Sequence, residues 1–334
     1  MHTIESRPLG RTGLEVSRLG LGGLFVASFL SERQQAVATV HRAIELGINY
    51  IDTAPGYGNS EEVMGDALRT ATAPVVLSTK LGGRPLPFDA QDKAGLTASF
   101  EESLRLLGRD RIDLLMIHEP DRPGQYGWWT DWYDLAGPVL DLAEEWKARG
   151  LIGAVGLGGT TVHELTHLCR TGRFDVVLTA FNYSLLWREA EHTVIAAARE
   201  MGMGVIAGSP LQQGALARKY DAIDDPAVYW LSPARREQFR AIYRVADAFG
   251  VSIAELAIRF VLSNPSVDTV LMGARSAEEV EKNVAAVQKG PLPSEILASL
   301  DAIYQMAPCR PFCEPFGIGW YLGNPRAYRG PGIA

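Results

Sequence analysis

The amino-acid sequence predicts a (β/α)8 TIM barrel, in which eight parallel strands close into a cylinder and helices cover the outside. Eight short apolar runs alternate along the chain with segments whose apolar residues recur at helical spacing. The runs contain few polar residues, as is typical of strands that are covered on both faces. The chain of 334 residues has no low-complexity linker, so residues 1–334 are predicted to form one barrel domain.

A β-hairpin is expected before the barrel, because short apolar runs flank the turn-rich tetrad at residues 10–13. The predicted barrel strands follow at residues 18–22, 50–52, 75–80, 112–118, 152–156, 176–178, 205–208 and 270–272. The predicted helices span residues 31–46, 61–69, 95–107, 135–149, 161–170, 190–200, 233–249, 253–262, 277–287 and 294–304. Several of these helices follow a Ser or Thr and precede a Gly, which is the usual chemistry of helix start and stop.

An open, doubly wound sheet is the alternative architecture for alternating strands and helices. Such a sheet normally carries a glycine-rich phosphate-binding fingerprint after its first strand. Here residues 20–23 read Gly-Leu-Gly-Gly and lack the third glycine at the required spacing. The closed barrel is therefore preferred.

Two aromatic regions interrupt the alternation of strands and helices. The first spans residues 121–137 and includes Trp128 and Trp129, and the second is the tail at residues 307–334, which includes Trp320. Long loops on a barrel are usually functional or disordered, and aromatic residues argue against disorder. We expect the three tryptophans to line a substrate pocket, with the tail near the active-site mouth. The alternative is that they cover the barrel or form a subunit contact, and a homo-oligomer is left open.

Charge and cysteine content narrow the class of protein. Lys and Arg number 32 and Asp and Glu 39, a formal net charge of −7, so no nucleic-acid partner is expected, because such proteins carry a basic footprint. The sequence has no apolar run of about 18 residues and no apolar leader, so no membrane partner is expected either. Cys169, Cys309 and Cys313 are too few for a disulfide framework, although the last two could pair or bind metal. A cytoplasmic location is the expectation.

Ionisable residues stand at the predicted C-terminal ends of three successive strands, on the face where barrels form their active sites. Asp52 ends the second strand, Lys80 the third and His118 the fourth, and Tyr57 follows Asp52 by five residues. Each has an ordinary explanation when taken alone, such as a loop acid or a packed turn aromatic. Their convergence at one rim favours a catalytic group.

Together the four residues suit proton transfer beside a carbonyl group. A tyrosine has a pKa of about 10, too high for efficient exchange near neutrality. The Lys80 ammonium is expected to lower the pKa of Tyr57, while Asp52 keeps Lys80 charged and in place. A neutral His118 is expected to hydrogen-bond the substrate oxygen and orient the substrate.

The motifs around these residues resemble those of the aldo-keto reductases, over residues 7–306. The pieces that carry the resemblance are RPLGRTGLEVS at 7–17, GINYIDTAPGYG at 47–58, STK at 78–80, IDLLMIH at 112–118, SPL at 209–211 and GARS at 273–276. The resemblance implies an oxidoreductase that transfers hydride between NAD(P)(H) and a carbonyl or alcohol substrate, which is an aldehyde, a ketone or a sugar. The family's catalytic tetrad maps onto Asp52, Tyr57, Lys80 and His118, with Tyr57 as general acid/base.

The resemblance also implies residues that hold the cofactor along the barrel mouth. They are Ser209, Leu211 and Gln213 around the pyrophosphate, Gly273 and Arg275 at the adenosine 2′-phosphate, Glu279 and Asn283 near adenine, and Gly158 and Asn182 near the nicotinamide. A helix start suits an anion, and Arg275 offers a permanently charged fork of donors. We therefore expect NADP(H) to be preferred, with NAD(H) as the alternative.

The chain departs from the common family pattern at three places. Gly158 and Gly159 stand where many members have a Ser-Asn pair that holds the carboxamide. Ala180 stands where many have Gln, with Asn182 close by, and Gly208 replaces an aromatic that stacks on nicotinamide. The Gly-Gly pair resembles the sequence of the aldose and galactose dehydrogenase branch of the family. This resemblance adds the oxidation of a sugar as a possible reaction.

Two further functions compete with this interpretation. Some proteins that resemble aldo-keto reductases are catalytically weak cofactor-binding subunits that dock a protein partner, and this is the alternative to an enzyme. Residues 163–167 match the H-E-x-x-H spacing of zinc hydrolases. However, Thr161 and Glu164 also read as a capping box, and no third ligand stands at a convincing distance, so no metal is expected.

Overall fold

A closed barrel of eight parallel strands forms the centre of the molecule in the computed structural model, which describes residues 4–27, 30–310, 314–315 and 317–327. The strands follow the chain around the barrel: β3 (Leu19–Gly22), β4 (Tyr50–Asp52), β5 (Val76–Leu81), β6 (Ile112–His118), β7 (Ile152–Gly159), β8 (Val176–Ala180), β9 (Gly204–Gly208) and β10 (Thr269–Gly273). Pairing of β10 with β3 closes the cylinder. The predicted (β/α)8 barrel is confirmed, and every predicted strand is present.

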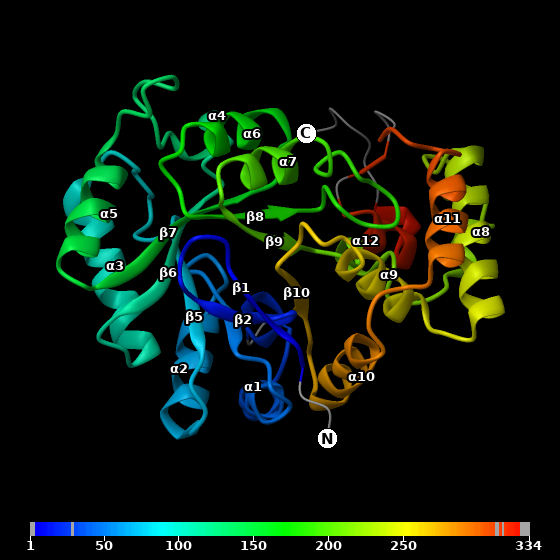
Figure 1. Cartoon of the computed structure of the whole chain (residues 1–334), viewed down its shortest axis with the longest axis horizontal. Helices are drawn as coiled ribbons and strands as arrows, with labels where there is room; N and C mark the ends of the chain where they lie inside the picture. Colours follow the sequence, from blue (N-terminus) through cyan, green and yellow to red (C-terminus); the bar gives the residue numbers. More distant parts are fainter. Residues whose placement is uncertain (1–3, 28–29, 311–313, 316, 328–334) are drawn as a thin grey trace.

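The predicted hairpin is also present and covers the N-terminal end of the barrel (Figure 1). Its strands are β1 (Ser6–Pro8) and β2 (Glu15–Ser17), paired antiparallel. Gly10 in the connecting turn has a φ of +52°, and a Cβ there would lie 2.1 Å from the amide nitrogen of Gly204 at the start of β9. Only glycine allows this close approach, so the turn is held against the barrel floor.

Helices surround the barrel on the outside (Figure 1). They are α1 (Arg33–Glu45), α2 (Ser60–Thr70), α3 (Lys93–Leu107), α5 (Pro138–Ala148), α6 (His163–Arg170), α7 (Val194–Glu200), α8 (Pro233–Phe249), α9 (Ile253–Leu262), α10 (Ala277–Gln288) and α11 (Ser294–Tyr304). Two short helices were not predicted: α4 (Pro123–Tyr126) and α12 (Ile318–Gly323). None of the helices in the described part of the chain is long and apolar enough to cross a membrane.

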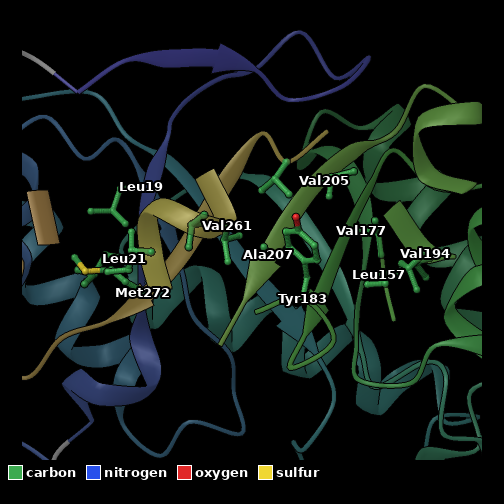
Figure 2. Close-up of a cluster of buried hydrophobic side chains, with 14 of the residues drawn as sticks. Leu19, Leu21, Leu157, Val177, Tyr183, Val194, Val205, Ala207, Val261 and Met272 are labelled. Carbon is green, nitrogen blue, oxygen red and sulfur yellow. The ribbon is translucent and has the colours of Figure 1, made fainter. Parts of the chain in front are cut away.

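Buried apolar side chains form two layers. The larger cluster lies between the strands and the surrounding helices, and Figure 2 shows part of it, where side chains of β8 and β9 approach Val194 of α7 and Val261 of α9. The smaller cluster includes Tyr50, Leu114 and Met116. The apolar strands are thus covered on both faces, as their composition predicts.

Arg18 ties the seam where the barrel closes. Its guanidinium is buried and donates to the backbone oxygens of Leu262 at 2.6 Å and Asp268 at 3.1 Å, and also to that of Val267. Burial lowers the pKa of Arg18 to about 10, so the side chain stays charged at neutral pH. The residue before the first barrel strand therefore binds the segment that leads into the last one.

The tail packs on the loop that follows β9. That loop contains a short 3-10 turn, η2 (Gln212–Gly214), and α12 lies against it. A Cβ at Gly319 would lie 2.3 Å from the amide nitrogen of Ala215, and one at Gly317 would lie 2.0 Å from Oε1 of Gln213. The tail is anchored through a fully buried ion pair of 2.7 Å between Glu314 and Arg235 of α8.

The three cysteines are spread over the fold. Cys169 is buried in α6 and Cys309 is exposed at the start of the tail, and both are free thiols. Burial raises the pKa of Cys169 to about 12. Cys313, and with it the suggested pairing with Cys309, lies outside the described residues.

Candidate active site

The four residues expected to be catalytic stand at neighbouring positions on one rim of the barrel. Asp52 is the last residue of β4, Lys80 is next to last in β5, and His118 is the last of β6. Tyr57 lies in the loop between β4 and α2. The C-terminal ends of parallel strands lie at the same rim of a barrel. Residues that are far apart in the sequence therefore come together there.

A buried ion pair forms the base of this site. The Lys80 Nζ donates to Asp52 Oδ2 at 2.5 Å and to the backbone oxygen of Thr53 at 2.8 Å. Ser78 Oγ donates to the other oxygen of Asp52 at 3.0 Å. Burial acts to lower the pKa of Lys80, but the charges and hydrogen bonds of Asp52 and Tyr57 outweigh it, and the net pKa is raised. The ammonium therefore stays charged at neutral pH.

Tyr57 and His118 face one another above this pair. Their rings are 5.7 Å apart between centroids and nearly perpendicular, at 84°. The Lys80 Nζ lies 4.9 Å from the centroid of the Tyr57 ring. The Lys80 ammonium and the His118 imidazole thus both lie close to the phenol ring of Tyr57, which is half-buried.

The pKa values of these two residues follow mainly from burial. Burial raises the pKa of Tyr57, and Lys80 opposes that shift without reversing it. The expected effect of Lys80 is therefore confirmed in direction, but the net pKa of Tyr57 is raised, because loss of solvent costs the phenolate more than the ammonium returns. Burial, assisted by the Lys80 charge, lowers the pKa of His118 to about 3, which keeps the imidazole neutral at pH 7.

The three tryptophans expected in a substrate pocket lie in different places. Trp128 is buried and donates from Nε1 to the backbone oxygen of His118 at 2.9 Å. Trp129 donates to the backbone oxygen of Pro120 at 2.9 Å and packs on Phe174. Trp320 on α12 is 65% exposed. Of the three, Trp128 is the one that contacts a rim residue.

Another aromatic residue, Tyr126 of α4, lies closer to the rim. Its ring is 6.3 Å from that of His118 at an interplanar angle of 18°. Phe88, in the loop after β5, packs edge-on against Tyr126 at 5.6 Å and against Trp128 at 5.3 Å. These rings form an aromatic wall beside His118, and the density of aromatics in residues 121–137 was the signal for it.

The loop after β9 presents an unusual backbone. Ser209, Gln212 and Gln213 have φ values of +55°, +50° and +51°, in the left-handed region that side chains rarely adopt. Leu211 precedes η2 and is partly buried against the core. Such local strain is typical of ligand-binding loops.

The start of α10 holds the second group of residues that were expected to bind a phosphate of the cofactor. Ser276 caps the helix by accepting from the Glu279 amide at 3.3 Å. Arg275 is 60% exposed and lies 3.3 Å from Glu279. Gly273 ends β10 just before, and Asn283 donates to the Met272 sulfur at 2.9 Å. A helix N-terminus beside an exposed guanidinium fits a phosphate group.

The region around Gly158 contains the carboxylate of Asp121, which the sequence motifs did not indicate. A Cβ at Gly159 would lie 2.6 Å from Oδ1 of Asp121, so this buried carboxylate fills the space that a larger residue would need. Asp121 Oδ2 accepts from the amides of Thr160 and Thr161 at 2.9 and 2.6 Å. The acidic pair in His118-Glu-Pro-Asp121 was the available signal.

Asn182 and Gly208 are also engaged with their neighbours. Asn182 Nδ2 donates to the backbone oxygen of Thr160 at 2.9 Å. Gly208 is the register partner of Ala180, and a Cβ on Gly208 would lie 3.3 Å from that of Ala180 and 3.0 Å from the Leu178 side chain. The small residues therefore pack tightly, which accounts for the lack of an aromatic at 208.

The residues of the H-E-x-x-H pattern lie in α6 and take part in its packing. His167 stacks on Trp132 with ring centroids 5.3 Å apart. The expected capping box is wrong: the N-cap is Val162 without a side-chain cap, because the Thr161 hydroxyl donates to Asp121 instead. Within the described ranges, no group of three or more His, Cys, Asp or Glu could hold a metal ion.

A closed parallel barrel with a buried Asp–Lys pair, a tyrosine and a histidine at its C-terminal rim defines the class of barrel oxidoreductases. The model of the Aldo/keto reductase family matches residues 18–305, and the chain belongs to this family. It is thus an oxidoreductase of the aldo/keto reductase type, as its motifs predict.

Curated relatives span nearly the whole chain. An L-galactose dehydrogenase of Arabidopsis thaliana is 31% identical over 331 residues, which cover 95% of this chain and 99% of the relative. A pyridoxal 4-dehydrogenase of Microbacterium luteolum is 30% identical, with coverage of 89% and 96%. A protein named probable voltage-gated potassium channel subunit beta, also of Arabidopsis thaliana, is 27% identical, with coverage of 92% and 99%.

Proposed function

We propose that the protein transfers hydride between NADP(H), in preference to NAD(H), and a carbonyl or alcohol substrate, with Tyr57 as general acid/base. The observation that carries the proposal is the contact set of Asp52, Lys80, Tyr57 and His118 at one rim. The likeness to dehydrogenases, L-galactose dehydrogenase among them, supports an aldehyde or sugar as the substrate. We expect the substrate to be a small molecule and the protein to act in the cytoplasm.

Each of the four residues has a definite task. In reduction, the Tyr57 hydroxyl donates its proton to the carbonyl oxygen, and in oxidation its phenolate removes the proton of the substrate hydroxyl. Lys80 stabilises the phenolate through its charge, and Asp52 holds Lys80 at 2.5 Å. The neutral His118 imidazole hydrogen-bonds the substrate oxygen. The nicotinamide, when bound, supplies or accepts the hydride.

The cofactor would be held along the same mouth. Ser209, Leu211 and Gln213 would surround the pyrophosphate, and Arg275 with the start of α10 would hold the 2′-phosphate. The exposure of Arg275 supports this role, because a phosphate can reach its guanidinium. Charge-assisted hydrogen bonds of arginine to phosphate are among the strong ones.

The test is a titration of the purified protein with NADPH and NADH, followed by quenching of tryptophan fluorescence. Arg275→Ala is expected to weaken NADPH binding by roughly tenfold or more, from the loss of charged hydrogen bonds, with little effect on NADH. Arg244→Ala is the control, because Arg244 is also exposed and paired with a glutamate, Glu237 of α8. Tighter binding of NADH by the wild type would remove the proposed role of Arg275.

The pH profile tests the proton-transfer step. The pKa of Tyr57 is raised above its ordinary value and that of His118 lies near 3. Alcohol oxidation needs the phenolate, so its rate is expected to rise with pH beyond about 10, whereas carbonyl reduction needs the phenol and stays level until that range. A step in kcat/KM between pH 5 and 8 that disappears on replacing His118 would contradict this assignment.

A cofactor-binding subunit that docks a protein partner is the second candidate. The observation in its favour is the relative named as a potassium channel subunit. Tight cofactor binding without turnover of any aldehyde, ketone or sugar would favour it over the enzyme.

A further inference from the structure

Glu119 directly follows His118 and has a strained backbone. Its φ is +52°, in the left-handed region that a glutamate rarely adopts. The amide of Glu119 donates to the backbone oxygen of Gly158 at 2.7 Å, which fixes this turn against β7. The strained turn ends β6 directly after His118, so Glu119 stands at the same rim of the barrel.

The carboxylate of Glu119 is held in place and stays accessible. Its Oε2 accepts from Thr160 Oγ1 at 2.8 Å and forms an ion pair of 2.9 Å with Arg122 Nε. The same Arg122 nitrogen donates to Thr160 Oγ1 at 2.8 Å. The side chains of Glu119 and Arg122 are 18% and 35% exposed. Within the described chain, the hydrogen bond and the ion pair of this carboxylate both use Oε2, so Oε1 remains as an acceptor.

The charge of Glu119 interacts with the charges of Lys80 and Tyr57. Burial raises the pKa of Glu119, and the Lys80 ammonium opposes this shift. In turn, the Glu119 charge adds to the raised pKa of Tyr57 and to that of Tyr126 in the aromatic wall. Glu119 is thus electrostatically coupled to the catalytic lysine and tyrosine and to the aromatic wall.

These groups offer a defined set of contacts to a substrate next to its reacting carbon. A carboxylate only accepts hydrogen bonds, a guanidinium only donates them, and an aromatic face packs on C–H groups. We propose that Glu119, positioned by Arg122 and Thr160, binds hydroxyl groups adjacent to the reacting carbon and selects polyhydroxylated or α-hydroxy carbonyl substrates. This inference rests on the proposed function and specifies its substrate class.

The selection works through the cost of leaving one carboxylate oxygen, Oε1, without a hydrogen bond. A substrate with hydroxyl groups replaces the water lost from Oε1, whereas a deoxy substrate of the same size removes that water and returns nothing. A site built to bond a substrate hydroxyl discriminates strongly against the analogue that lacks it. Glu119 is therefore a specificity-determining residue, and Tyr57 remains the proton donor.

The experiment compares glyceraldehyde with propanal, which share a three-carbon aldehyde and differ in their hydroxyl groups. Steady-state kinetics with NADPH give the ratio of kcat/KM for the two aldehydes in the wild type, in Glu119→Asn and in Glu119→Gln. Asparagine tolerates the left-handed backbone, so the first variant removes the charge and shortens the side chain without forcing the turn. Glu102→Gln is the control, since Glu102 forms an exposed pair with Arg105 on α3.

In Glu119→Asn the ratio is expected to fall about 30-fold, the range of one charged hydrogen bond, mainly through a higher KM for glyceraldehyde. Glu119→Gln, which keeps an acceptor oxygen at the same reach, is expected to retain part of the ratio, and Glu102→Gln all of it. An active wild type whose ratio stays the same in Glu119→Asn would overturn the assignment of Glu119 alone. A wild type that turns over neither aldehyde nor any hydroxylated carbonyl would overturn the proposed function itself.

Discussion

Replacing Tyr57 with phenylalanine is expected to lower kcat by about 10²–10⁴-fold, the usual contribution of a positioned general acid or base. The phenyl ring keeps the edge contact with His118 and loses only the hydroxyl that exchanges the proton. The dissociation constant of the cofactor is expected to stay nearly the same, because the substitution removes no group from the loop after β9 or from α10. Stopped-flow and steady-state measurements with one aldehyde check both values.

The matched control is Tyr133→Phe, which removes the same hydroxyl from a tyrosine that is 82% exposed. It is expected to leave both kcat and cofactor affinity unchanged. Full turnover by Tyr57→Phe would exclude Tyr57 as the general acid/base and would turn attention to His118.

Replacing Lys80 with methionine is expected to lower the free energy of unfolding by about 3–5 kcal/mol, because it leaves the Asp52 carboxylate buried without its cation. Asp52 is 1% exposed and Lys80 2%, so water cannot screen the remaining charge. Turnover should fall as well, since the phenolate of Tyr57 loses its neighbouring ammonium. Urea unfolding followed by circular dichroism, together with kcat, measures the two effects.

The double variant Asp52→Asn with Lys80→Met separates stability from chemistry. Removing both charges is expected to restore most of the stability, because a buried pair replaced as a whole often costs little. Turnover is expected to stay low. A single Lys80→Met variant as stable as the wild type would mean that Asp52 is protonated or hydrated in the folded protein.

The strands and the four rim residues could be predicted because their signals are local. An apolar run that ends in an ionisable residue is visible in the sequence at Asp52, Lys80 and His118, and the barrel fold then brings these ends together. Helix starts were less predictable. The expected start of α7 at residue 190 moves to Val194, since residues 182–190 form a separate turn in which the Ala190 amide donates to the Asn182 backbone oxygen.

Other features depend on contacts that no local pattern reveals. The direction of the Tyr57 pKa shift follows from burial, which only the assembled site determines. The place of Asp121 against Gly159 joins the loop after β6 to the end of β7, and neither residue alone suggests it. The helix α12 was not predicted, because it contains glycines at 319 and 323 and begins after another at 317. Those at 317 and 319 are needed for its contact with η2.

The contact between α12 and η2 also has a consequence for biosynthesis. A ribosome releases the loop that contains Gln213 before it releases the tail, and chains begin to fold while they are being synthesised. The barrel strands can therefore pair while the loop after β9 still lacks the surface that packs on Gly317 and Gly319. A nascent chain whose residues 317–323 are still inside the ribosome thus lacks the surface that packs on the loop after β9, and release of α12 allows this part of the mouth to reach its final form.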